Sequence, residues 1–168
     1  KEELYLPQVA VGVRDIVGTG NFASEYAVAS KTFGRTDVTL GVGWGRLAGD
    51  GVISNPLSQF DDRFDTRPGY SGVGGEFNVN QFFSGSKVGL FGGVSRSFES
   101  LPVTAMLEYN PDQYDGDFSR GVPRPESPWS AGLTWHALPG MDLRLSLQHG
   151  DKIGFGFRSY LGSKAEFP

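Results

Sequence analysis

The chain has 168 residues, enough for one domain with a sizeable core and too few to expect two. Its formal net charge of -4, without a cluster of Lys and Arg, argues against nucleic acid as a partner, because nucleic-acid binding needs a basic surface. It contains no cysteine, which excludes disulfides, thiolate catalysis and cysteine-based metal sites within it. Its 25 Gly, 13 Phe, 6 Tyr and 3 Trp favour an all-β fold.

Eight segments along the chain have the residue types and the alternation of β-strands. We expect strands at residues 5–16, 24–33, 36–47, 87–97, 102–109, 128–137, 141–149 and 152–161. Most of these segments have about nine to eleven residues, which is the length of a strand that crosses a bilayer at a tilt. No uninterrupted apolar run approaches the roughly 18 residues that a membrane-spanning helix needs.

The alternation is clearest at residues 141–148, where Leu143, Leu145 and Leu147 alternate with Asp142, Arg144 and other polar residues. A strand directs successive side chains to opposite faces, so this segment has one apolar and one polar face. Positions filled with charge or glycine do not suit an ordinary buried core. They are typical of a barrel with a polar lumen and an apolar face toward lipid.

The connections between the expected strands alternate in length. Those at 34–35, 98–101 and 138–140 are tight, whereas those at 47–86 and 110–127 are long and rich in Gly, Pro, Asp and Ser. Short turns at one rim and long loops at the other are typical of outer-membrane barrels, with the short turn at 150–151 as an exception. We therefore predict an antiparallel up-and-down outer-membrane β-barrel, or part of one, with about eight strands in a single region over residues 1–168.

Two sets of residues follow from this prediction. Tyrosine and tryptophan prefer the boundary between water and lipid, so we expect an aromatic girdle on the apolar face, with Trp135 toward the opposite rim. Its members are Tyr26, Trp44, Tyr109, Trp129 and Trp135. The alternative is that these aromatics pack in the core of a soluble β-sandwich. The expected lumen-facing polar residues are Arg14, Glu25, Lys31, Glu108, Asp142, Arg144, Gln148 and Arg158.

The mixed signs of the lumen-facing set favour structural ion pairs over a path for transported ions. The long loop with Asp112, Tyr114, Asp115 and Asp117 combines carboxylates and aromatics that could hold a cation or stack on sugar rings. A solvated anionic loop is the commoner explanation, and the same holds for the carboxylates and arginines at 61–67.

No motif for a cofactor, a metal or catalysis stands out in the sequence. The glycine-rich strings lack the strand, spacing and helix that direct backbone amides at a phosphate. His136 and His149 fall at opposite ends of the expected strands, which disfavours a shared metal. There is no G-x-S-x-G elbow and no convincing Ser, His and Asp constellation. We expect no cofactor and no enzymatic activity.

The sequence also resembles a known family. The runs LPQVAVGVRDI at 6–16, TLGVGWG at 39–45 and LFGGV at 90–94 are similar to the YjbH-like outer-membrane proteins linked to exopolysaccharide and capsule production. The resemblance implies a non-catalytic barrel component of a polysaccharide secretion system in the bacterial outer membrane. It also implies a fragment of a longer protein, in which strands from elsewhere cover the edges of the first and last strands here.

Three functions remain open at this point. The first is the exopolysaccharide secretion component, with membrane lipid, polysaccharide and periplasmic proteins of the same system as partners, and no nucleic acid. The second is a soluble β-sandwich that binds carbohydrate through the loop at residues 112–118. The third is a general porin-like channel.

Overall fold

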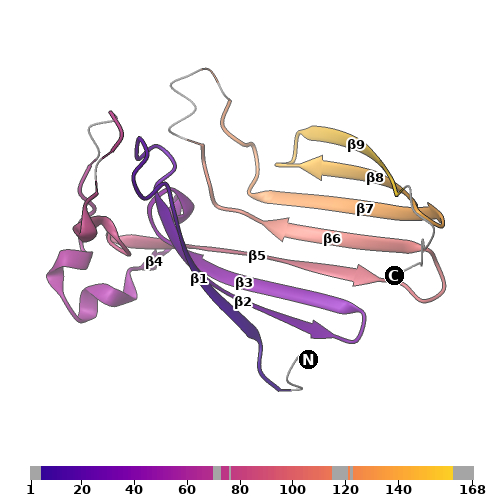
Figure 1. Cartoon of the computed structure of the whole chain (residues 1–168), viewed down its shortest axis with the longest axis horizontal. Coiled ribbons are helices and arrows are strands. Elements are labelled where there is room, and N and C mark those ends of the chain that lie inside the picture. Colours follow the sequence, from indigo (N-terminus) through magenta and orange to yellow (C-terminus); the bar gives the residue numbers. More distant parts are fainter. Residues whose placement is uncertain (1–4, 70–72, 76, 115–120, 122, 161–168) are drawn as a thin grey trace.

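The computed structural model describes residues 5–69, 73–75, 77–114, 121 and 123–160. Nine strands form an antiparallel sheet, in which eight follow the order β1-β2-β3-β5-β6-β7-β8-β9 and the short β4 pairs with β5 (Figure 1). The strands are β1 (Gln8–Arg14), β2 (Ser24–Phe33), β3 (Thr36–Gly43), β4 (Ile53–Ser54), β5 (Lys87–Ser97), β6 (Val103–Tyr109), β7 (Trp129–Leu138), β8 (Met141–Gln148) and β9 (Lys152–Ser159). Within the described part of the chain, no helix is both long enough and apolar enough to cross a membrane.

All eight predicted strands are present, and β2 and β5 have the predicted bounds. The strand expected to end at Leu47 ends at Gly43, because the chain turns at Gly45, where φ is +62°. The turn leads into the short 3-10 helix η1 (Gly45–Ala48). The sequence did not predict β4, which has two residues and is held by Val88 and Lys87 of β5.

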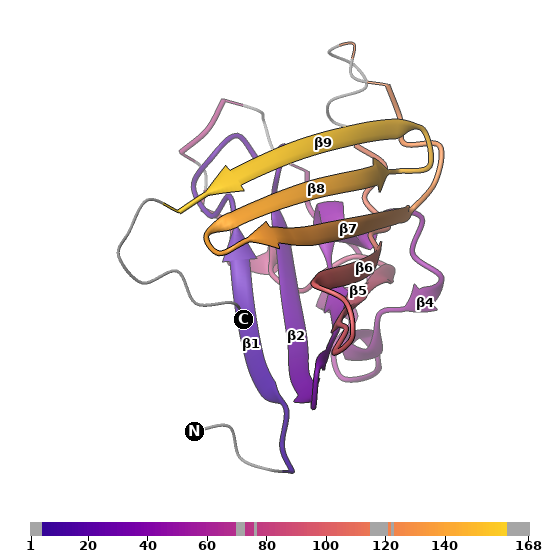
Figure 2. The same cartoon turned by 90° about the vertical axis from the view of Figure 1, so that its right-hand side faces the viewer.

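The sheet is strongly twisted, so that β7, β8 and β9 run across β1 and β2 when the molecule is seen from its side (Figure 2). The antiparallel all-β prediction is confirmed. Closure into a barrel is not seen: among the described residues, β1 pairs with β2 and β9 pairs with β8, and these two edge strands do not pair with each other.

The connections divide the sheet into two ends. At the turn end lie the tight connections β2–β3, β5–β6 and β7–β8, with Gly34 and Gly140 at positive φ of 63° and 78°. At the loop end lie the two long connections and the short β8–β9 turn, where His149 and Gly150 have positive φ. The predicted alternation of short and long connections is therefore confirmed, including its one exception.

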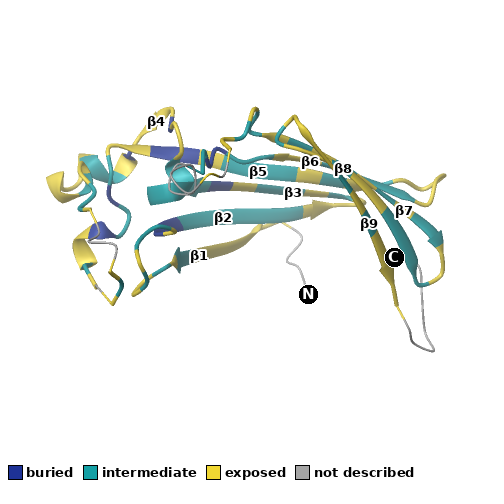
Figure 3. Ribbon diagram, turned by 90° about the horizontal axis from the view of Figure 1, so that it is seen from above, coloured by how far each residue is buried: buried dark blue, intermediate teal, exposed yellow. Residues whose placement is uncertain are grey.

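The connection between β3 and β5 folds into a compact lobe at the loop end. It contains η1, β4, η2 (Pro56–Gln59), η3 (Asp62–Phe64) and η4 (Val79–Gln81). Figure 3 shows that the buried segments gather at this end of the sheet. Among the described residues, the only buried hydrophobic side chains are Ala23, Trp44 and Val88, and they lie with the buried polar residues Ser24, Glu25, Asn55, Gln81, Ser84 and Asp112. Away from this end, the described strands bury no hydrophobic side chain on either face.

Candidate functional site: the two faces of the sheet

The strand register assigns every sheet residue to one of two faces, because residues directly opposite each other on neighbouring strands share a face. One row across six strands is apolar throughout and consists of Ile153, Leu147, Ala131, Leu107, Val94 and Val38. The next row, on the other face, consists of Gly154, Ser146, Gly132, Met106, Ser95 and Asp37. We call the first the apolar face and the second the polar face.

The apolar face is exposed over its whole width. Each of the eight long strands contributes at least one exposed large hydrophobic side chain to it, and examples are Val11, Phe33, Leu40, Leu90, Leu107, Leu133, Leu145 and Phe155. Leu145 is 53% exposed and Phe155 is 76% exposed. Soluble monomers rarely expose a continuous apolar surface of this extent, and such surfaces are typical of contacts with lipid or with another protein.

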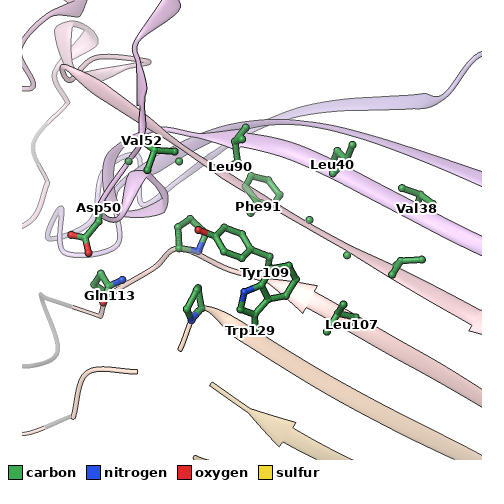
Figure 4. A pocket seen from close by; sticks show the side chains of 17 residues that line it. Val38, Leu40, Asp50, Val52, Leu90, Phe91, Leu107, Tyr109, Gln113 and Trp129 are labelled. Carbon is green, nitrogen blue, oxygen red and sulfur yellow. The ribbon is translucent and has the colours of Figure 1, made fainter. Parts of the chain in front are cut away.

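A hollow of about 670 Å³ lies on the apolar face toward the loop end (Figure 4). Its sheet walls include Val38, Leu40, Leu90, Leu107, Tyr109 and Trp129, and Asp50, Val52 and Gln113 approach from the loops. Gly92 lies between Leu40 and Tyr109 in the register and offers no side chain to fill this space. The hollow is continuous with the exposed apolar surface and has few polar groups to bind a hydrophilic ligand.

Three of the five predicted girdle residues lie on the apolar face. Tyr109 and Trp129 are directly opposite each other near the loop end, with ring centroids 5.0 Å apart. Trp135 lies on the same face of β7, opposite Val103 and Leu143, and is 48% exposed. Six residues at about 3.3 Å each place Trp135 roughly 20 Å from Trp129 along the strand.

The prediction is wrong for the other two aromatics. Tyr26 is opposite Gly12 and Gly43 and so lies on the polar face, where its ring covers Gly12. Trp44 is only 5% exposed, because Phe83 packs against its ring at 5.1 Å and Asn55 accepts a hydrogen bond from its indole N–H at 3.0 Å. The loop lobe therefore covers Trp44.

Six of the eight predicted lumen-facing residues share the polar face, and these are Arg14, Glu108, Asp142, Arg144, Gln148 and Arg158. The other two do not. Glu25 is opposite Val13 and Lys31 is opposite Val38, so the register assigns both to the apolar side. Lys31 Nζ donates to the Leu6 carbonyl at 3.1 Å, and Glu25 belongs to the loop lobe.

An ion pair between Glu25 and Arg67 forms the centre of the lobe. Each carboxylate oxygen of Glu25 accepts a hydrogen bond of 2.8 Å from Arg67, and the backbone N–H of Phe83 donates a third at 3.0 Å. The side chains are 2% and 18% exposed. The acidic neighbours of Arg67 in the sequence suggested a solvated surface loop. For Arg67 this prediction is wrong, because its side chain is largely buried against Glu25.

Asn55 joins three parts of the same lobe. Its side-chain oxygen accepts from Trp44 and from the backbone N–H of Leu57, and its amide donates to the carbonyls of Phe83 and Gly85 at 2.9 Å. Asn55 was not among the residues predicted from the sequence. The one signal in the sequence for this buried cluster was Glu25, a carboxylate at the start of a strand that is otherwise largely uncharged. That signal does not identify the partners of Glu25.

The predicted saccharide or cation loop is only partly described, and Asp115 and Asp117 lie outside the described residues. Asp112 is buried, with Arg46 Nε at 2.7 Å from one oxygen and the Tyr114 backbone N–H at 2.9 Å from the other. Burial, followed by the Asp112 carboxylate, raises the pKa of the Tyr114 hydroxyl. Asp112 is thus bound to its own protein, and the described residues include no group of three or more His, Cys, Asp and Glu that could hold a metal.

The two histidines lie at opposite ends of the sheet, as predicted. His136 Nδ1 is 2.8 Å from Asp142 Oδ1 near the turn end, and His136 Nε2 is 3.1 Å from the Thr104 hydroxyl. His149 lies in the β8–β9 turn at the loop end, with its Nε2 at 3.3 Å from the Tyr114 hydroxyl. Both rings are therefore engaged in local structure.

Comparison with known proteins gives the relationship of this chain. Residues 1–165 match the family described as "Exopolysaccharide biosynthesis protein YbjH". The chain belongs to the YjbH exopolysaccharide biosynthesis family. It is 39% identical over 156 residues to the "Uncharacterized lipoprotein YjbH" of Escherichia coli (strain K12), in a match that covers 93% of this chain and 22% of that protein. No solved structure matches the chain.

The family membership confirms the resemblance found in the sequence, and the chain spans about a fifth of the length of its E. coli relative. In this YjbH-family sheet the two faces have different chemical capacities. The apolar face can stabilise contact with lipid or with an apolar protein surface. The polar face offers hydroxyls, amides and charges that can hydrogen-bond a hydrophilic ligand.

Proposed function

We propose that this chain forms part of the wall of an outer-membrane β-barrel that serves exopolysaccharide production and secretion, in a non-catalytic role. The observation that carries the proposal is the exposed apolar face, to which all eight long strands contribute. In a bilayer this face would contact acyl chains, and the polar face would line the lumen. The name of the E. coli relative, a lipoprotein, is consistent with a protein attached to a membrane.

The positions of the aromatic residues support this orientation. Tyr109 and Trp129 lie near the loop end of the apolar face, and Trp135 lies roughly 20 Å away toward the turn end. The apolar band of outer-membrane barrels is about 25 Å tall and has aromatic residues at both boundaries. The two positions therefore suit the two interfaces of one bilayer.

The proposal requires partners for both edges of the sheet. Hydrocarbon cannot satisfy exposed backbone groups, so β1 and β9 need further strands beside them in a membrane. We propose that other parts of a longer protein supply these strands, since the E. coli relative is several times the length of this chain. Periplasmic proteins of the same secretion system are the expected partners at the turn end.

Two other functions make different demands on the structure. A soluble carbohydrate-binding sandwich needs a second layer against the apolar face, and the described residues cover that face only at its loop end. A general porin needs an open, conducting lumen, which conductance in planar bilayers would detect. Neither is favoured by a specific observation in the structure.

A pair of neighbouring cysteine substitutions tests the orientation of the wall. Leu145→Cys lies on the apolar face and Ser146→Cys lies on the polar face of the same strand. Each is introduced into the protein expressed with all of its flanking sequence, in a background without other reactive thiols, and outer membranes are treated with a water-soluble maleimide. We expect Ser146→Cys to be labelled and Leu145→Cys to be protected until detergent or a lipid-soluble maleimide is added. Equal labelling of both by the water-soluble reagent would contradict the proposal.

A further inference from the structure

Two hollows on the polar face meet and form one elongated trough. The first, of about 420 Å³, is lined by β6 to β9 and by Tyr114. The second, of about 360 Å³, extends over β3 and β5 toward Asp37 and Phe91. Both are walled by the same four residues, Met106, Glu108, Asn110 and Arg144. A trough that crosses several strands has the shape to hold a chain-like ligand.

Arg144 lies where the two hollows meet. Its side chain starts on β8 and crosses β7 above Gly132, and its Nη2 lies 3.7 Å from the Met106 sulfur on β6. A methyl group at Gly132 would lie 3.2 Å from Met106 Cε and 3.9 Å from Arg144 Nε. On the other side, Arg144 is opposite Gly156 of β9. Thr134 is directly opposite Arg144 on β7, but Gly132 and Gly156 add no side chain beside it, and Arg144 lines both hollows.

Like Arg14 and Arg158 on the same face, Arg144 forms none of the ion pairs found among the described residues, but of these three arginines it alone lines the two hollows. His136 pairs with Asp142, Arg46 pairs with Asp112 and Arg67 pairs with Glu25. Within the described residues, no carboxylate lies at ion-pair distance from Arg144. A guanidinium has five N–H donors in a planar arrangement that matches a carboxylate with two parallel hydrogen bonds. A ligand carboxylate would complete this site.

The rest of the trough suits sugar hydroxyls. Thr39, Ser95, Ser130 and Ser146 supply hydroxyls, and Asn110 and Gln148 supply amides. Tyr114 and Phe91 supply rings on which a sugar can stack. Glu108 also lines the trough and can accept hydrogen bonds from sugar hydroxyls, but it repels a dense row of anions. The trough therefore favours a glycan with separate carboxylates over a polyphosphate.

We propose that this trough binds a segment of an acidic, carboxylate-bearing glycan, with Arg144 holding a carboxylate of the sugar chain. The inference rests on the proposed function, since it places the polar face in a lumen that polysaccharide enters.

The test is calorimetric titration of the purified protein, with all of its flanking sequence and in detergent micelles, with a short oligogalacturonate. The methyl ester of the same oligosaccharide is the neutral control ligand. We expect binding of the acid form and at least tenfold weaker binding of the ester. Arg144→Gln should weaken binding of the acid form by about tenfold to a hundredfold and leave binding of the ester unchanged.

Arg158→Gln is the matched control, because Arg158 lies on the same face, lines neither hollow and carries the same charge. It should change the affinity by less than about twofold. Arg144→Lys keeps the charge but loses the planar pair of donors and should give an intermediate loss. Three results would each overturn the inference: equal losses of affinity in Arg144→Gln and Arg158→Gln, equal binding of the acid and the ester, or no binding of the acid form. The cysteine-labelling pattern is independent of these results, so the proposed wall could stand if the trough were refuted.

Discussion

The ion pair between Glu25 and Arg67 gives a quantitative test of how the loop lobe is held together. Arg67→Met removes the cation and leaves a carboxylate that is 2% exposed without its two hydrogen bonds of 2.8 Å. An unpaired buried charge costs about 3–5 kcal/mol. Because Arg67 also donates to the Gln81 carbonyl at 2.9 Å, its loss should open the segment around η4 as well.

The combination with Glu25→Gln separates charge from packing. A neutral amide at residue 25 can still accept from the Phe83 N–H and leaves no buried charge when Arg67 is absent. We expect the Glu25→Gln, Arg67→Met double variant to be more stable than Arg67→Met alone, by about 1–3 kcal/mol. The coupling free energy between the two substitutions should therefore be large and should exceed the coupling free energy of a pair of exposed charges.

The assay is native-state hydrogen exchange, because the lobe can open without unfolding of the sheet. The amides of Phe83 and Asn55 report the opening free energy, since each is hydrogen-bonded within the lobe. Arg63→Met is the control: Arg63 lies in the same loop and pairs with Asp61, but the two side chains are 61% and 51% exposed, so little change is expected. If Arg67→Met changed the opening free energy no more than Arg63→Met, or if the two effects in the double variant simply added, the reasoning would fail.

Three further predictions concern the two faces and the loop. Gly41→Val should lower the free energy of unfolding in urea by about 1–3 kcal/mol because its side chain would overlap the Phe91 ring, and an unchanged midpoint would argue against that packing. In vesicles with brominated lipid, the fluorescence of a variant whose only tryptophan is Trp135 should be quenched, whereas that of a variant with only Trp44 should not. Equal quenching of the two variants would place both indoles in lipid. Tyr114 should ionise only above pH 10, because burial and Asp112 raise its pKa. Its neutral form therefore contributes stability that is present below pH 10 and lost as the pH rises through the folded-state pKa. The check is a difference absorbance titration against Tyr114→Phe, and a Tyr114 pKa equal to that of an exposed tyrosine would contradict the expectation.

The strands and their faces were predictable wherever side-chain size and polarity alternate strictly. Residues 141–148 alternate between leucine and polar residues, so the face of each residue could be read directly from the sequence. Residues 27–29 are Ala-Val-Ala, which looks the same in either register, and Tyr26 was therefore assigned to the wrong face. Its true position follows from the glycines opposite it, and only the strand pairing reveals them.

The loop lobe was not predictable from the sequence for a different reason. Its contacts join residues far apart in the chain, such as Glu25 and Arg67, and no periodic pattern records them. Arg67 follows several aspartates, which suggested a solvated loop, yet its partner is on β2. Trp44 looked like a girdle residue because it extends the alternation of β3, but the strand ends at Gly43 and the lobe covers the ring.

The distribution of burial links the fold to its environment. A soluble domain of this size is stabilised mainly by a continuous hydrophobic core, but the described residues bury hydrophobic side chains only near the loop end. The lobe is stabilised by a network of buried ion pairs and hydrogen bonds, whose partners lie within the lobe, at the start of β2 or in the β6–β7 connection. The sheet has hydrogen bonds and the His136–Asp142 ion pair on its polar face, but the large hydrophobic side chains of its other face are exposed. Burial of the apolar face would therefore stabilise the sheet. Our proposal is that acyl chains cover this face along the whole width of eight strands, whereas a protein partner would have to match that width.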